Sequence, residues 1–300
     1  MKPLLSNNEL FSLLQTIQQS HKIVICAHRG PDGDAVGSSL GWAEYLTQLG
    51  KKVTVVLPNP FPDFLRWLPN SHLIQYYCRH EANASAIINE ADLIFCLDFN
   101  GLSRLQEMQG VVARAKADKI IIDHHIDPDT KVAKQVISFP NMCATSEIIF
   151  RLIYQLGGFE SMTLGGATCL YTGMMTDTGG FTYNSNNPEI YEVISLLLTK
   201  GIDKDKIYRN VFNVYSVDRM RLTGYILYEK LKFYANNRAS IYTLTRNEMK
   251  RFNFIRGDAE GLVNMPLQVK GMRLSISLRE DTERDVIRVS LRSVDDFPCN

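Results

Sequence analysis

Three short apolar runs in the first half of the chain each end in a histidine or an aspartate. They cover residues 23–27, 93–97 and 119–122, and His28, Asp98 and Asp123 follow them. Short apolar runs bounded by turn residues are typical of buried strands. Ligands of open α/β sheets bind beyond the carboxyl ends of the strands. We therefore expect these three side chains to meet at one edge of a sheet.

Helix-like stretches alternate with these runs, which predicts a mainly parallel sheet flanked by helices, an α/β fold. A further strand is expected over 53–57. Gly50 is a plausible C-terminal cap for the first of the helices. The expected helices cover residues 34–49, 103–115, 144–156, 163–175, 188–200 and 217–231, and a turn carrying a carboxylate is expected at 176–180.

The pattern changes after Asn236 and Asn237, where strand-like alternation returns at 240–244, 273–278 and 286–291. We expect a second, smaller α/β domain there. The predicted organisation is a metal-binding domain over 1–187, a helical linker over 188–237 and a substrate-binding domain over 238–300.

Charge and composition exclude several classes of function. The formal net charge of +1 over 300 residues provides no basic field, so we expect no binding of long duplex DNA. A short nucleotide needs only a local group of cations. No run of about 18 apolar residues is present, which predicts no membrane span. The six cysteines form no CxxC pair, and with the absence of a signal-like leader they favour a reducing cytoplasm.

The mixture of imidazole and carboxylate predicts a divalent first-row metal such as Mn²⁺. Each cluster has another explanation when taken alone. Asp34 could cap a helix, Asp98 could cap a turn, paired histidines could be buried and hydrogen-bonded, and Asp177 could be a turn residue. Together, at the ends of strands and helices on one expected edge, they favour a metal site.

The joint pattern resembles the DHH phosphoesterases, which are named for their Asp-His-His triplet. Order and spacing agree over most of residues 22–181. The matching segments are Ala27-His28-Arg29-Gly30-Pro31-Asp32-Gly33-Asp34-Ala35-Val36-Gly37-Ser38, Leu97-Asp98-Phe99-Asn100, Ile122-Asp123-His124-His125 and Thr172-Gly173-Met174-Met175-Thr176-Asp177-Thr178-Gly179.

The resemblance implies two metal ions, usually Mn²⁺, that share one carboxylate. It implies that His28, Asp32 and Asp98 hold one ion. The other ion would be held by Asp34, Asp98, His124 and Asp177. Two further residues are implied in catalysis, Asp123 by orienting a ligand imidazole and His125 by acting near the scissile phosphate.

The resemblance extends to the domain that is often appended to DHH catalytic domains. It is carried by Glu260-Gly261-Leu262-Val263-Asn264 and Val289-Ser290-Leu291-Arg292-Ser293. Arg292 would clamp a phosphate, with Ser293 and Asn100 as further substrate contacts. The family normally continues into a Gly-Gly-Gly-His segment. This chain stops at Asn300, so we expect an incomplete second domain and weaker substrate binding.

The resemblance implies a nanoRNase that trims very short RNA to mononucleotides, removes phosphate from 3′-phosphoadenosine 5′-phosphate (pAp), or does both. One alternative is hydrolysis of linear dinucleotides derived from cyclic-di-AMP. Another is a non-catalytic nucleotide-binding protein. The length and charge disfavour RecJ-type exonucleases and polyphosphatases, and the first loop lacks the GxGxxG of dinucleotide binders. A homodimer is left open.

Overall fold

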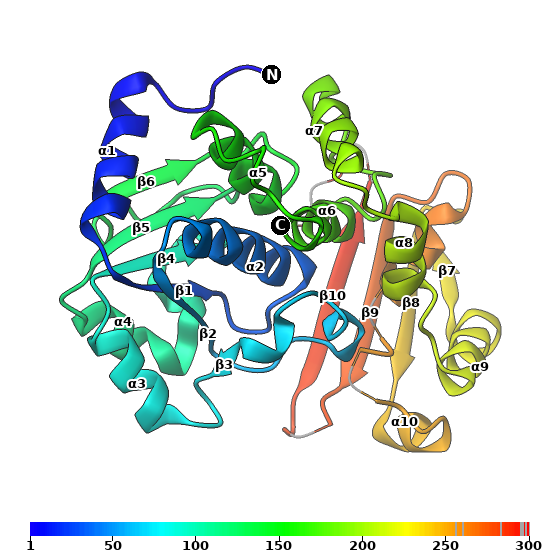
Figure 1. Ribbon diagram of the computed structural model, residues 1–300. Coiled ribbons are helices and arrows are strands. Elements are labelled where there is room, and N and C mark those ends of the chain that lie inside the picture. The colour runs from blue at the N-terminus through cyan, green and yellow to red at the C-terminus, as the bar shows by residue number, and fades with distance from the viewer. Residues whose placement is uncertain (256, 260, 283, 295–296, 298, 300) are drawn as a thin grey trace. The chain divides into compact units, whose positions relative to one another are not determined.

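The apolar runs predicted as strands lie next to one another in a six-stranded sheet in the computed structural model (Figure 1). The strand order is β3-β2-β1-β4-β5-β6, and every neighbouring pair is parallel. The predicted parallel sheet is thus confirmed. Its strands are β1 (Lys22–Ala27), β2 (Lys52–Leu57), β3 (Gln75–Tyr76), β4 (Leu93–Leu97), β5 (Asp118–Asp123) and β6 (Gln135–Ser138).

The strand order reverses between β1 and β4. The chain moves outward from β1 through β2 to β3, then returns to the centre and moves the other way from β4 to β6. A crevice forms outside the carboxyl ends of the strands at such a switch point. His28 follows β1 and Asp98 follows β4, so these two residues lie at the place where the topology provides a binding site.

The structure describes residues 1–255, 257–259, 261–282, 284–294, 297 and 299. It divides into two compact units, Met1–Asn213 and Val214–Asn300. The division falls inside the expected linker segment 188–237. The helices of the first unit are α1 (Asn7–Gln19), α2 (Gly33–Gln48), α3 (Glu81–Asn89), α4 (Gln109–Arg114), α5 (Thr145–Gln155), α6 (Leu164–Asp177), α7 (Pro188–Thr199) and α8 (Lys204–Phe212).

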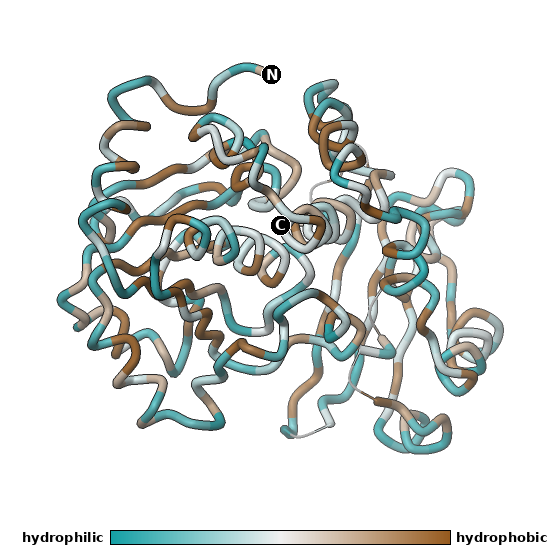
Figure 2. The backbone as a smooth tube through the Cα atoms, in the orientation of Figure 1, coloured by the Kyte–Doolittle hydropathy of each residue, from teal (hydrophilic) through white to brown (hydrophobic). Residues whose placement is uncertain are grey.

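Two apolar cores hold these helices to the two faces of the sheet. Side chains of a strand alternate between faces, so Ile23 and Ile25 join one core while Val24 and Cys26 join the other. Helices α2, α5 and α6 pack on the first face, and α3 and α4 pack on the second (Figure 1). Hydrophobic residues follow the strands and polar residues gather in the outer turns (Figure 2).

One expected helix of the first unit is not continuous. Residues 103–115 were predicted to form one helix, but a 3₁₀ helix, Leu102–Met108, precedes α4 and is interrupted at Gln106, which has a φ of 52°. Within this interrupted segment the Arg104 carbonyl accepts the Arg29 N–H at 2.8 Å. The break in the helix therefore coincides with a tertiary contact to the loop after β1.

The second unit contains a four-stranded mixed sheet of order β10-β9-β8-β7. Its central pair, β8 and β9, is parallel, and both outer pairs are antiparallel. Its core includes Leu222, Tyr242 and Met249. The elements are α9 (Val217–Tyr225), a π-helical turn (Ile226–Lys230), β7 (Lys232–Tyr234), β8 (Ala239–Leu244), α10 (Arg246–Arg251), a 3₁₀ helix (Leu262–Gln268), β9 (Leu274–Glu280) and β10 (Ile287–Ser293).

No helix in the described ranges combines the length and the apolar character needed to cross a bilayer.

Candidate metal centre

Asp32 and Asp34 each hold the beginning of a different helix. Asp32 Oδ1 accepts the backbone N–H groups of Asp34 at 3.0 Å and Ala35 at 3.1 Å, and so caps α2. The Asp34 carboxylate is buried and instead accepts two N–H groups at the start of α5. These come from Thr145 at 2.6 Å and Ser146 at 2.8 Å. Asp34 is therefore not the cap of its own helix, which was the simpler explanation for it.

Asp98 directs its two oxygens toward different histidines. Its Oδ2 lies 3.5 Å from His28 Nε2, and its Oδ1 lies 3.7 Å from His124 Nε2. Thr145 Oγ1 also donates to Oδ1 at 3.0 Å. Asp98 has a φ of 63°, a left-handed conformation that aspartate tolerates better than most residues. The backbone thus turns sharply after β4 and places a buried carboxylate between two imidazoles.

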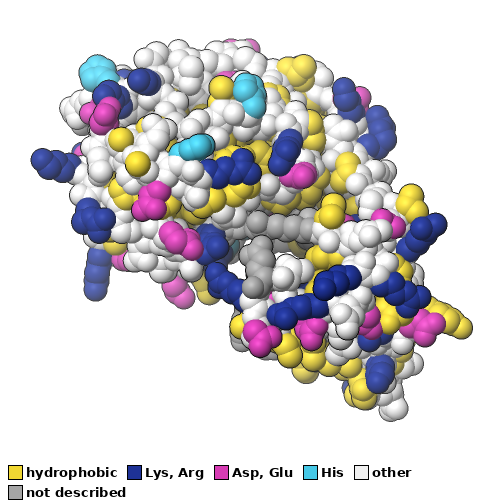
Figure 3. Space-filling model, turned by 90° about the horizontal axis from the view of Figure 1, so that it is seen from below, with side chains coloured by type: hydrophobic (Ala, Val, Ile, Leu, Met, Phe, Trp, Pro, Cys, Tyr) yellow, Lys and Arg dark blue, Asp and Glu magenta, His cyan; other side chains and the backbone are white. Residues whose placement is uncertain are grey.

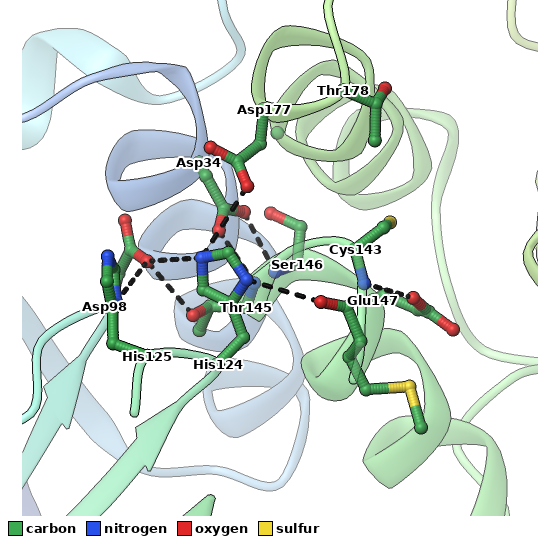
Figure 4. A network of polar contacts seen from close by, with 12 residues as sticks. Asp34, Asp98, His124, His125, Cys143, Thr145, Ser146, Glu147, Asp177 and Thr178 are labelled. Atoms are coloured by element: carbon green, nitrogen blue, oxygen red, sulfur yellow. Dashed lines mark hydrogen bonds and ion pairs between the residues drawn. The ribbon is translucent and has the colours of Figure 1, made fainter. Parts of the chain in front are cut away.

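Both histidines of the triplet lie beside Asp98 (Figure 4), but their other partners differ. His124 Nδ1 contacts the Met142 carbonyl at 3.3 Å, which turns Nε2 toward Asp98 and toward Asp177 Oδ2, 3.5 Å away. His125 Nδ1 instead pairs with Asp123 Oδ1 at 2.7 Å. Asp123 is fully buried, whereas 42% of the His125 side chain is exposed. His124 therefore faces the cluster, and His125 presents part of its ring to solvent.

Close packing of α2 against α6 brings Asp34 and Asp177 to the same side of the cluster. A Cβ on Gly37 would lie 2.5 Å from the Cys169 carbonyl oxygen of α6. A Cβ on Gly173 would lie 2.0 Å from Ser146 Oγ and 2.9 Å from Asp34 Oδ1. Both positions require glycine because a methyl group would separate the helices. These two glycines therefore determine how closely the carboxylates approach.

Three groups of side chains place potential ligand atoms within 4.8 Å of one another. The groups are His28, Asp32 and Asp98; Asp34, His124 and Asp177; and Asp98, His124 and His125. All six residues predicted as metal ligands are thus brought together, and Asp98 belongs to two of the groups.

The donor set of the cluster suits a cation. Over the described part of the chain, the ion pairs of Asp32, Asp98 and Asp177 involve histidines and no lysine or arginine. Concentrated carboxylate charge without a basic side chain to balance it fits hard divalent ions, and imidazole fits first-row metals.

The protonation equilibria reflect this crowding of charge. Burial opposes the charge on His28, but pairing with Asp98 and the nearby Asp32 raise its pKa to about 9. Burial raises the pKa of Asp177 to about 7. Burial, with the charges of Asp98 and Asp177, raises the pKa of Asp34 well above its usual range. The metal-free cluster therefore retains protons that a bound cation would displace.

None of the predicted substrate contacts belongs to these groups of potential ligands. Asn100 Nδ2 donates to the Ile126 carbonyl at 2.9 Å and so joins the loops that follow β4 and β5. Arg292 is exposed on β10 of the second unit, and Ser293 Oγ there contacts Cys299 Sγ at 3.1 Å. Glu260, the first residue of the other segment that resembles the appended domain, lies outside the described residues.

Sequence reasoning missed the residues that hold the ligands. Thr145 and Ser146 hold Asp34, Thr145 also holds Asp98, and the Met142 carbonyl orients His124. A signal was present, because the start of the expected helix over 144–156 offers free N–H groups that favour an anion. The sequence did not show which carboxylate would occupy that position.

Comparison with known proteins extends this description. Residues 22–174 match the DHH family, N-terminal domain. The chain is 29% identical over 272 residues to the bifunctional oligoribonuclease and PAP phosphatase NrnA of Thermus thermophilus, covering 90% of this chain and 76% of the relative. It is 24% identical over 284 residues to the protein of the same name from Bacillus subtilis, covering 94% and 84%.

A solved structure also matches the whole chain. The crystal structure of an exopolyphosphatase-related protein from Bacteroides fragilis shares 49% sequence identity with it, and the TM-score is 0.96. The match covers 100% of this chain and 87% of that one.

Proposed function

This chain belongs to the DHH family, and we propose that it is a two-metal phosphoesterase that hydrolyses very short oligoribonucleotides to mononucleotides, pAp to AMP, or both. The observation that carries the proposal is the position of Asp98 between His28 and His124, where one carboxylate can serve two cations. The two relatives named for both oligoribonuclease and PAP phosphatase activity support the choice of substrates.

We assign the metal ligands as the motifs suggest. His28, Asp32 and Asp98 would hold the first ion. Asp34, Asp98, His124 and Asp177 would hold the second, with Asp98 shared. When bound, the ions would neutralise phosphate charge and lower the pKa of an attacking water. We propose Mn²⁺ because the site mixes imidazole with carboxylate oxygens.

His125 and Asp123 are the residues we propose to act on the phosphate. The hydrogen bond to Asp123, opposed by partial burial, raises the pKa of His125. The imidazole is therefore held in its charged form more strongly at neutral pH. Since Nδ1 is engaged by Asp123, Nε2 is the atom that can reach substrate. A charged ring there would stabilise a phosphate oxygen or donate a proton to the leaving oxygen.

We propose that the substrate is short because the chain has almost no excess of positive charge to hold a long one. The formal net charge is +1. On the face shown in Figure 3, lysine and arginine side chains are interspersed with aspartate and glutamate. Long nucleic acids require many neutralised phosphates. Arg292, Ser293 and Asn100 are our candidates for the few polar contacts that a mononucleotide or dinucleotide needs.

Two other functions are compatible with the same ligand set. Linear dinucleotides derived from cyclic-di-AMP present the same phosphodiester to the metals. A non-catalytic nucleotide-binding protein would bind a nucleotide at this site without hydrolysing it. We also propose that the protein works in the cytoplasm.

A product assay separates these functions. The full chain would be incubated with Mn²⁺ and, in parallel, RNA of about two to about twenty nucleotides, pAp, a linear adenosine dinucleotide and polyphosphate. An Asp98→Asn variant controls for contaminating enzymes. We expect mononucleotides from the shortest RNA, AMP from pAp, and slow cleavage of the longest RNA. Binding of nucleotide without any product would contradict the proposed enzymatic activity. Turnover of polyphosphate alone would show that the substrate is polyphosphate and not a nucleotide.

A further inference from the structure

Residues 142–146, here called the clamp segment, contact three of the proposed ligands at once. The Met142 carbonyl contacts His124 Nδ1, and the Thr145 and Ser146 amides donate to Asp34. Thr145 Oγ1 donates to Asp98. Asp34 and His124 both belong to the proposed second metal position. The geometry of that position therefore depends on where the clamp segment lies.

Glu147 fixes the backbone of the clamp segment through a hydrogen bond from Cys143. One of its carboxylate oxygens, Oε2, accepts the Cys143 N–H at 2.9 Å, inside the segment. The other, Oε1, accepts from Arg151 Nε at 2.9 Å and Nη2 at 2.6 Å (Figure 4 shows the Cys143 contact). Glu147 is fully buried and only 2% of the Arg151 side chain is exposed. Both oxygens are therefore committed, and the side chain is fixed at both ends.

Arg151 carries this connection to a third element. Its Nη1 donates to Glu189 Oε2 at 2.7 Å, at the beginning of α7. Buried ion pairs contribute little to stability on average, because apolar replacements are often neutral or stabilising. Stability alone is therefore a weak reason for a buried Glu–Arg–Glu network here. Its attachment to the clamp segment suggests a different reason.

We propose that Glu147 and Arg151 are positioning residues that hold the clamp segment in place and thereby keep Asp34 and His124 in the geometry of the second metal position. The inference rests on the proposed two-metal function and deepens it. Neither residue belongs to the groups of potential ligands, so each acts through the backbone of residues 142–146. Partners that orient metal ligands typically contribute about 10- to 100-fold to metal affinity.

The first metal position is held in a different way. His28 Nδ1 contacts the Arg29 carbonyl at 3.0 Å, and Asp32 is fixed by the cap of α2. In the described part of the chain, the clamp segment reaches this position only through the Thr145 contact to the shared Asp98. Loss of Glu147 should therefore weaken the second position much more than the first, whereas general destabilisation of the fold would affect both positions equally.

Glu147→Gln is the sharpest test. A glutamine has the same length, but an amide NH2 group replaces one of the two carboxylate oxygens and cannot accept the hydrogen bond that this oxygen receives from Cys143 or from Arg151. Glu189→Gln is the matched control, since it removes a carboxylate charge from the same network on the side remote from the clamp segment. Leu13→Ala in α1 controls for stability, because it empties a fully buried apolar site elsewhere in the first unit.

The measurement is a titration of each variant of the 300-residue chain with Mn²⁺, in which electron paramagnetic resonance gives the concentration of free Mn²⁺. Circular dichroism verifies that each variant is folded. We expect two ions in the wild-type chain, in Glu189→Gln and in Leu13→Ala. In Glu147→Gln we expect one site whose affinity changes little and a second weakened by about 10- to 100-fold. If Glu147→Gln does not fold, Arg151→Lys should show the same selectivity, because an ammonium cannot reproduce the guanidinium fork.

Two outcomes would overturn the inference, and they differ from failure of the proposed function. Unchanged affinities at both sites in folded Glu147→Gln would remove the positioning role. Equal weakening of both sites, matched by Leu13→Ala, would reduce the network to general stability. A wild-type chain that binds no Mn²⁺ would instead refute the two-metal proposal, and the positioning role with it.

Discussion

Asp34 accepts the backbone N–H of Thr145 at 2.6 Å, although 111 positions separate the two residues in the sequence. The contact joins the loop after β1 to the beginning of α5. It holds a buried carboxylate whose pKa is raised by burial and by the neighbouring charges of Asp98 and Asp177. The ligand is thus oriented before any cation binds. A cation that enters needs to displace protons rather than rearrange the side chain.

Asp98→Asn should remove turnover and lower metal occupancy at both positions. The amide preserves the shape of the side chain, but it removes the charge shared by the two ions, whose mutual repulsion is then less compensated. Elemental analysis of dialysed protein gives the metal content. His124→Ala is the matched comparison and should reduce mainly the metal occupancy of the second position. Two fully occupied ions in Asp98→Asn would contradict the bridging role.

The thermal stability of the metal-free chain and its gain from metal should depend on pH in opposite directions. The pKa of His28 is raised from 6.5 to about 9, so its stabilising contribution is complete below about pH 6.5 and is lost as the pH rises through about 9. The raised pKa of Asp177, about 7, acts in the same direction. Metal binds the deprotonated ligands and therefore binds more tightly as pH rises.

The corresponding measurement is Tm with EDTA and with saturating Mn²⁺ between about pH 6 and about pH 8. The shift in Tm caused by Mn²⁺ should grow as the pH rises. Over the same interval, deprotonation of His28 and Asp177 should lower the Tm of the EDTA sample. A shift that stays constant over this interval would argue that Asp177 and His28 do not take part in metal binding.

Asp123→Asn should lower kcat by about 10- to 100-fold while leaving the metal content unchanged. Asp123 pairs with His125 Nδ1 at 2.7 Å and contributes most to the raised pKa of that imidazole. Without the charge, the His125 pKa falls and the ring is less firmly oriented. Steady-state kinetics on pAp and NMR titration of the His125 ring provide the two readings. An unchanged His125 pKa in the variant would show that Asp123 does not control the protonation of His125.

Arg292→Ala should raise KM for a dinucleotide with little change in metal content. Loss of a charge-assisted phosphate contact costs about 1.5–3 kcal/mol, which corresponds to about 10- to 100-fold in KM. Arg221→Ala removes another exposed arginine of the second unit and serves as control. If both variants have the same kinetics as the wild-type chain, Arg292 is an ordinary surface residue.

The sheet and most of its helices could be predicted because their signals are local. The runs that became β1, β2, β4 and β5 are apolar and short, and α2 ends where Gly50 adopts a φ of 77°. Strands β3 and β6 were missed because they are very short or mostly half-buried and carry little hydrophobic pattern. The expected turn at 176–180 begins later than predicted, because α6 continues through Asp177.

The arrangement of the site was only partly accessible from the sequence. Strand ends and parallel topology predict that His28, Asp98 and His124 share an edge, since those relationships follow from the period and order of the strands. The contacts of Thr145 and Glu147 depend on how α5 packs against α2 and α6. Gly37 sets how closely α6 approaches α2, and Gly173 sets how closely α6 approaches α5; the effect of both glycines is visible only in three dimensions.

Anomalous diffraction from crystals grown with Mn²⁺ tests the central claim most directly, because it locates each ion without reference to activity. We predict two peaks that share Asp98, one among His28, Asp32 and Asp98 and the other among Asp34, Asp98, His124 and Asp177. A single peak, two peaks that do not share Asp98, or no peak beside these residues would contradict the two-metal account.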